Sequence, residues 1–180
     1  TLIDGLAAVG LTLLAGYAGQ ISLGHMAFAG IGAYTSAILS TRFGLNPWLA
    51  MLPAMALTGL TAALVGVPLL RLRGHYLALG TLGLGLVISS AMKELSGLTG
   101  GPSGFAGIPR LGLFGHPLST PEYCAAAALI ALAVGWLVAR LVRSRTGRLL
   151  QAMRDSEIGA AMTGIDARRL KLQIFAVSAM

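Results

Sequence analysis

The sequence predicts an all-α fold, a polytopic bundle of transmembrane helices. Of its 180 residues, 56% are hydrophobic and only 11% are charged, and the mean hydropathy is +0.80. The apolar residues form long blocks separated by short Gly, Pro or Arg stretches, without the alternation of a β-strand. In lipid every backbone polar group must be paired within its own segment or around a closed barrel, so such blocks favour helices.

Hydropathy describes a single transmembrane domain, 1–180, with five complete apolar segments and the start of a sixth. The approximate segments are 2–18, 26–41, 47–70, 75–92, 122–142 and, incomplete, 172–180. As helices the third and fifth reach about 36 and 31 Å, enough for a hydrocarbon core of about 30 Å, whereas the second reaches only about 24 Å. Because the chain starts without Met and its last apolar run is too short to cross a bilayer, we expect a fragment truncated at both ends.

The 13 Lys and Arg residues predict the orientation. If residues 143–171 are cytoplasmic, alternation leaves Arg42, Lys93 and Arg110 outside and every other basic residue inside. The opposite orientation inverts that ratio, so the positive-inside rule predicts a periplasmic loop at 93–121 and a cytoplasmic loop at 143–171. The same distribution accounts for the net charge of +7 without a nucleic-acid partner.

A polar, glycine-rich stretch joins the first two apolar segments, with the sequence Gly16-Tyr17-Ala18-Gly19-Gln20-Ile21-Ser22-Leu23-Gly24-His25. Polar side chains at membrane depth cost free energy unless they pair or line a water-filled path. A short, Gly-interrupted segment is also typical of a broken helix that faces a transported solute. The candidate path residues are Gly19, Gln20, Ser22, Gly24 and His25. A plain cytoplasmic turn, with Gln20 and Ser22 in water and His25 capping the next helix, is the alternative, and both stay open on the residues alone.

The predicted outer loop is rich in glycine, which favours tight turns with positive φ or exposed backbone donors. Its candidate residues are Thr99, Gly100, Gly101, Pro102 and Gly104, and a plain flexible loop is the simpler interpretation. The sequence contains no phosphate-binding G-x-x-x-x-G-K-[ST] motif. Because Cys124 is the single cysteine, neither a disulfide within the chain nor a cysteine metal cluster is expected.

The charged stretch from Gly147 to Lys171 predicts a short amphipathic helix. Ile158, Ala161, Met162 and Ile165 recur at helical spacing. Asp155 or Ser156 is expected to cap this helix and Gly164 to end it, and Asp166 to cap the next. An apolar stripe on a cytoplasmic helix needs either the membrane surface or a groove in another protein.

Four motifs, in order, resemble those of the permease subunits of branched-chain amino acid ABC transporters, the LivM/LivH family. They are Gly16–His25, Arg71–Tyr76, Thr99–Gly104, and Gly147-Arg148 with Arg154–Ile165. The resemblance covers nearly the whole chain. Within the family, Arg71-Leu72-Arg73-Gly74 followed by the Gly-Gly-Pro loop is similar to the LivM type.

The resemblance implies a bacterial inner-membrane, multi-pass transport subunit that is not an enzyme. It implies that the helix after Arg154 docks into an ATPase subunit, with coupling residues Arg154, Asp155, Glu157, Ile158, Ala160, Ala161, Met162 and Gly164. Gly159, where relatives commonly carry Ala, lowers the helix propensity of that turn. The implied partners are ABC ATPase subunits, a second, paralogous permease subunit, a periplasmic amino acid-binding protein and the lipid membrane. ATP and Mg are expected on the ATPase subunits, and no cofactor, metal or catalytic residue on this chain.

One alternative stays open on the residues, and two others fit them less well. Close relatives carry urea and short amides, so the solute is open between these and branched-chain amino acids. A secondary transporter driven by an ion gradient predicts buried ionisable residues along the path, and only His25 answers that description. An intramembrane hydrolase using Ser22 and His25 lacks a third, orienting group.

Overall fold

The fold is described from a computed structural model. It describes residues 2–72, 74–101, 104, 107–108, 112–113, 116–117, 119–156, 162 and 166–180. Helices dominate these residues, which confirms the all-α class predicted from the sequence. The only strands among them are β1, Gly112–Leu113, and β2, His116–Pro117, an antiparallel pair of two residues each.

The long helices follow the apolar blocks of the sequence. They are α1 (Leu2–Leu11), continued by the π-helix η1 (Thr12–Tyr17), α2 (His25–Arg42), α3 (Pro47–Leu69), α4 (His75–Glu94), α6 (Thr120–Arg143) and α9 (Ala167–Ala179). Two shorter helices are α5 (Ser96–Thr99) and α7 (Arg145–Asp155). Hence the stretch 143–171, expected as a loop, contains α7, and α9 begins five residues before the predicted segment at 172.

Local signals in the sequence explain where several helices begin. Pro47 occupies the first turn of α3, and the Asn46 side chain accepts a hydrogen bond from the Trp48 N–H at 3.1 Å. At α6 the Ser119 N–H donates to Glu122 at 2.8 Å, one half of a capping box. The predicted cap at Asp166 is confirmed, because its carboxylate accepts from the Arg169 N–H at 3.1 Å.

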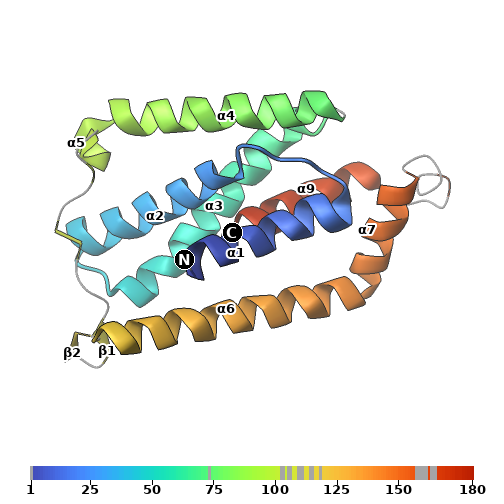
Figure 1. Cartoon of the computed structure of the whole chain (residues 1–180). Helices are drawn as coiled ribbons and strands as arrows, with labels where there is room; N and C mark the ends of the chain where they lie inside the picture. Colours follow the sequence, from blue (N-terminus) through green and yellow to red (C-terminus); the bar gives the residue numbers. More distant parts are fainter. Residues whose placement is uncertain are drawn as a thin grey trace.

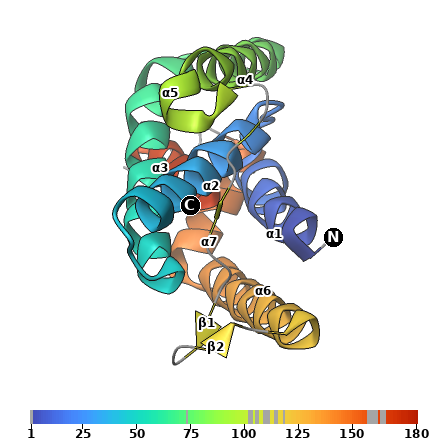
Figure 2. The ribbon, with the colours of Figure 1, turned by 90° about the vertical axis from the view of Figure 1, so that its left-hand side faces the viewer.

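The helices form a layered bundle in which α4 and α6 lie on opposite sides. Helices α1, α2, α3 and α9 lie between them (Figures 1 and 2). We call the end where α7 lies the α7 end, and the opposite end, with α5 and the β1–β2 pair, the α5 end (Figure 1). Helix α4 runs from the α7 end to the α5 end, and α6 runs in the reverse direction.

The buried core lies where η1, α2, α3, α7 and α9 meet. Its members are Leu13, Leu14, Ala18, Phe28, Ala62, Leu150, Met153, Leu170, Ile174 and Phe175. The rings of Phe28 and Phe175 pack edge to face with centroids 5.5 Å apart. Gly66 lets α9 approach α3, since a Cβ there would lie 2.9 Å from Leu172 Cδ1.

The outer helices of the bundle expose apolar surface. Three helices within the described residues, α3, α4 and α6, are long and apolar enough to cross a membrane. All residues of α6 are described and none is buried, while Leu129, Leu132 and Trp136 are more than 60% exposed. Apolar surface of this extent is stable in lipid and not in water, so the chain is a membrane protein.

Candidate functional site

The candidate site is built around the non-helical stretch Gly19–Gly24, called here the 19–24 segment. It separates η1 from α2, because Gly19 adopts a left-handed conformation, φ +66°, which ends the preceding helix. Figure 1 shows the segment, in dark blue, turning back from the α7 end toward the middle of the molecule, where α2 begins. The two flanking helices therefore do not form a simple hairpin.

Side chains of the 19–24 segment alternate between buried and exposed. Gln20 and Ser22 are 3% and 5% exposed, whereas Ile21 and Leu23 are 52% and 58% exposed. The polar residues thus face the protein interior and the apolar ones face outward. A solvated turn does not fit this arrangement, so the alternative of Gln20 and Ser22 in water is wrong.

Helix α4 holds the end of this segment by a hydrogen bond and a close backbone approach. The Leu23 N–H donates to Thr81 Oγ1 at 3.0 Å. A Cβ on Gly24 would lie 1.9 Å from the Thr81 carbonyl oxygen, and a Cβ on Gly85 would lie 3.1 Å from Gly24 Cα. Two glycines therefore let the backbones of the segment and of α4 touch.

His25 is the first residue of α2, and its side chain contacts α9. Its Nε2 lies 2.9 Å from the carbonyl oxygen of Ser178 on α9, and no side-chain cap is formed at Gly24. Gly10 of α1 faces the same place, since a Cβ there would lie 3.3 Å from His25 Nε2. His25 thus joins α2 to α1 and α9 instead of capping α2.

Several buried polar atoms around the segment have no hydrogen-bond partner among the described residues. They are both side-chain heteroatoms of Gln20, the hydroxyl of Ser22 and Nδ1 of His25. An unpaired buried polar group costs free energy, about 1–3 kcal/mol each, and such groups in a folded protein call for an explanation. Three of the five predicted path residues therefore carry spare hydrogen-bonding capacity inside the bundle.

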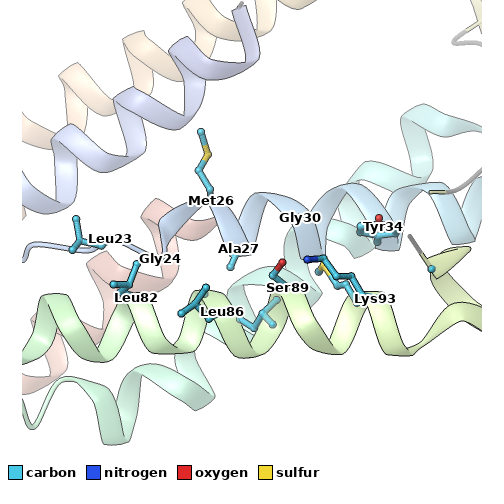
Figure 3. A pocket seen from close by; sticks show the side chains of 14 residues that line it. Leu23, Gly24, Met26, Ala27, Gly30, Tyr34, Leu82, Leu86, Ser89 and Lys93 are labelled. Carbon is cyan, nitrogen blue, oxygen red and sulfur yellow. The ribbon is translucent and has the colours of Figure 1, made fainter. Parts of the chain in front are cut away.

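A cleft of about 410 Å³ lies between α2 and α4 and begins at the 19–24 segment (Figure 3). Its wall next to the segment is apolar, with Leu23, Met26, Leu82 and Leu86. Polar side chains stand toward the α5 end, where Ser89 and Lys93 of α4 reach toward α2, and Tyr34 and Gly101 complete the lining. The cleft therefore offers one cationic and hydroxyl-bearing end and one apolar end.

The outer-loop residues form a compact turn beside this cleft. Thr99 is buried, and its hydroxyl accepts from the Gly101 N–H at 3.2 Å. Gly100, Gly101 and Gly104 have φ of 79°, 63° and 74°, which confirms the prediction of positive φ. Pro102 lies outside the described residues.

The coupling residues are only partly described. Arg154 and Asp155 end α7, and Met162 is 84% exposed. Glu157, Ile158, Ala160, Ala161 and Gly164 lie outside the described residues, so the predicted amphipathic helix stays a prediction. The side chain of Arg154 turns toward the bundle, where its Nη1 donates to the Gly16 carbonyl oxygen.

Sequence reasoning did not single out some partners of the site. Gly10 and Ser178 contact His25 and lie in apolar runs with no local signal. Thr81, which holds the segment, recurs with Gly85 and Ser89 at every fourth position, a pattern that predicts helix packing but not this hydrogen bond. Helix α7 did leave a signal, because Gly147, Leu150 and Met153 are spaced three apart and all are buried.

The comparisons with known proteins identify the family. The family model described as "Branched-chain amino acid transport system / permease component" matches residues 1–180. This chain belongs to that family. The permease family predicted from the four sequence motifs is thus confirmed.

Two curated relatives of this permease chain are named "High-affinity branched-chain amino acid transport system permease protein LivM". One is from Escherichia coli (strain K12), 33% identical over 204 residues, covering 99% of this chain and 48% of the relative. The other, from Salmonella typhimurium, is 33% identical over 205 residues with the same coverage. Both relatives are named LivM, in agreement with the LivM type predicted from Arg71–Gly74. The chain spans about half the length of these relatives, and no solved structure gives a significant match.

Proposed function

We propose that this chain forms part of the permease of an ATP-binding-cassette importer that carries branched-chain or related amino acids across the bacterial inner membrane. The observation that carries the proposal is the buried polar 19–24 segment, held inside a bundle of membrane-spanning length, in a chain of a transport permease family. Interrupted helices at membrane depth are where transporters expose backbone and polar groups to a solute. The names of the two relatives supply the solute class.

The cleft beside the segment suits such a solute. A branched-chain amino acid carries a carboxylate and an ammonium group at one end and an aliphatic side chain at the other. Lys93 and the hydroxyls of Tyr34 and Ser89 supply donors for the carboxylate at the α5 end, and the leucines near the segment supply an apolar surface. Gln20, Ser22 and His25 do not line this cleft, and their unpaired atoms are buried. In this proposal a movement of the 19–24 segment exposes them, and they then pair with the moving solute.

The proposed orientation places the α7 end in the cytoplasm. The described basic residues there include Arg71, Arg140, Arg143, Arg145, Arg148, Arg154, Arg168, Arg169 and Lys171, against Arg42 and Lys93 toward the α5 end. A periplasmic amino acid-binding protein then delivers solute to the α5 end. Paired ATPase subunits, which bind ATP and Mg, engage the part of the coupling region that follows Arg154, residues 155–164, on the other side. A second permease subunit completes the path.

Uptake by the full transporter tests this function. The permease, its ATPase subunits and binding protein are reconstituted in proteoliposomes and supplied with radiolabelled leucine or urea. We expect leucine uptake that needs ATP and the binding protein, with urea carried at least tenfold more slowly. Faster urea uptake would assign the short-amide alternative, and uptake abolished by a protonophore but independent of ATP would assign a secondary transporter.

The role of the 19–24 segment has its own test, because a structural role and a transport role of Ser22 predict different effects of its removal. A structural role predicts lower thermal stability, whereas a transport role predicts lower leucine uptake without a loss of stability. Removing an unpaired buried hydroxyl relieves a desolvation cost, so Ser22→Ala is expected to leave thermal stability unchanged or raise it. The same change is expected to lower leucine uptake at least fivefold. Ser36→Ala on α2 is the matched control. Unchanged uptake in Ser22→Ala would remove this residue from the path.

A further inference from the structure

The contact between α7 and the end of η1 carries an inference that rests on the proposed function. The Arg154 guanidinium donates through Nη1 to the carbonyl oxygen of Gly16. The aliphatic part of the same side chain covers Gly19, because a Cβ there would lie 3.3 Å from Arg154 Cγ. One side chain thus contacts both sides of the point where the first helix stops.

The chemistry of this contact matches its place in the fold. The last carbonyl groups of a helix lack partners within the helix and carry partial negative charge, which an Arg side chain pairs with and neutralises. Gly19, with φ +66°, has no side chain between Arg154 and the backbone turn. Arg154 therefore holds the end of η1 against α7, directly beside the turn at Gly19.

Helix α7 cannot shift without moving η1. Leu150 and Met153, which are 0% and 3% exposed, belong to the same buried core as Leu13 and Leu14 of η1. At its start α7 is also packed on the end of α6, since a Cβ on Gly147 would lie 1.9 Å from the carbonyl oxygen of Val142 in α6. Close-packed contacts of this kind transmit displacement because they leave no room for independent movement.

The next residues after α7 are those proposed to engage the ATPase. We propose that Arg154 is a positioning residue: it couples movement of the ATPase-engaging segment to the interrupted helix by holding the Gly16 carbonyl, and it does not bind the ATPase. A displacement of residues 155–164 on ATP binding reaches the path through α7, Arg154 and Gly16. The interruption at Gly19 then acts as the hinge at which the 19–24 segment changes course.

The test separates coupling from ATPase docking. The complete transporter is reconstituted with Arg154→Ala or with Arg154→Lys, which keeps the charge but not the planar guanidinium. ATPase co-purification, ATP hydrolysis and leucine uptake are measured. Arg145→Ala, which removes an exposed arginine from the first turn of the same helix, is the matched control.

We expect Arg154→Ala to retain the ATPase subunits and hydrolysis within twofold of wild type, while leucine uptake falls at least tenfold. ATP hydrolysed per leucine carried then rises at least fivefold, a ratio that simple loss of folded protein does not change. Arg154→Lys is expected to show a smaller rise, and it supplies the measurement if the Ala variant does not assemble. Loss of ATPase co-purification would overturn the proposal in favour of direct docking, and an unchanged ratio in both variants would overturn it outright. Wild-type protein that carries no leucine would instead reject the proposed function.

Discussion

Single residues decide how closely the 19–24 segment approaches its neighbours. The atoms that set this approach are backbone atoms of Gly24 and Thr81, where no rotamer change can make room. Glycine is required there by contact and not by φ, since Gly24 has φ −99°. A glycine on the same helix as Thr81 but without such a neighbour provides a direct comparison.

Gly24→Ala is therefore expected to displace the segment from α4. Accommodating the new methyl group costs about 1–3 kcal/mol through overpacking, and the Leu23–Thr81 hydrogen bond is lost with it. Gly83→Ala on α4 meets nothing within 4 Å and is expected to leave stability unchanged or raise it by up to about 1 kcal/mol. Thermal unfolding of the purified permease, followed by tryptophan fluorescence, measures both. Equal effects of the two changes would contradict the contact.

Thr81 gives a second comparison at this scale. Thr81→Val keeps the shape of the side chain but leaves the Leu23 N–H without its acceptor, at a cost of about 1–3 kcal/mol. Thr81→Ser keeps the hydroxyl and is expected to cost less. Hydrogen–deuterium exchange at the Leu23 amide measures the hydrogen bond to Thr81 directly. We expect faster exchange in Thr81→Val than in Thr81→Ser. Identical exchange would mean that the hydroxyl does not hold this amide.

At the scale of elements, hydropathy predicts the fold class well and the site poorly. Helix α6 spans Thr120–Arg143, close to the segment 122–142 predicted from hydropathy. The two agree because a long apolar run in lipid can pair its backbone polar groups only as a helix. The 19–24 segment inverts the usual rule, with Gln20 and Ser22 buried and Ile21 and Leu23 exposed. The local sequence predicts the polar residues of this stretch as candidates, but the contacts that hold it, on α4 and α9, lie far away in the sequence and leave no local pattern in it.

Helix α7 is a further element that hydropathy missed, because its apolar residues are too few to stand out in a basic stretch. Leu150→Ala is expected to destabilise the permease by about 2–5 kcal/mol, since it leaves a cavity in the core shared with η1. Its neighbour Leu149 is 38% exposed, and Leu149→Ala is expected to cost under about 1 kcal/mol. The midpoint of thermal unfolding compares the two, and similar midpoints would mean that α7 is not docked on η1.

At the scale of the whole molecule, the proposed roles of the buried polar segment and of the coupling route depend on the orientation of the bundle in the membrane. The cleft with Lys93 must open toward the periplasm, and the α7 end must face the ATPase, for delivery and coupling to fall on opposite sides. Helix α6 connects these two ends in one span of 24 residues, about 36 Å long, which is enough for a bilayer core. Reporters at its two ends therefore read the orientation of the whole bundle.

Cys124 is the single cysteine of this sequence, so Cys124→Ala, combined with replacement of any cysteine elsewhere in the permease, gives a background in which one new thiol reports at a time. Thr120→Cys, at the exposed start of α6, is expected to react with a membrane-impermeant maleimide in intact cells. Arg145→Cys, at the exposed start of α7, is expected to react only after the membrane is permeabilised, because the arginine-rich end is held inside. Leucine uptake by each variant serves as the check that it assembles. The reverse labelling pattern would place α7 in the periplasm, out of reach of any ATPase, and both the proposed transport mechanism and the role of Arg154 would fall with it.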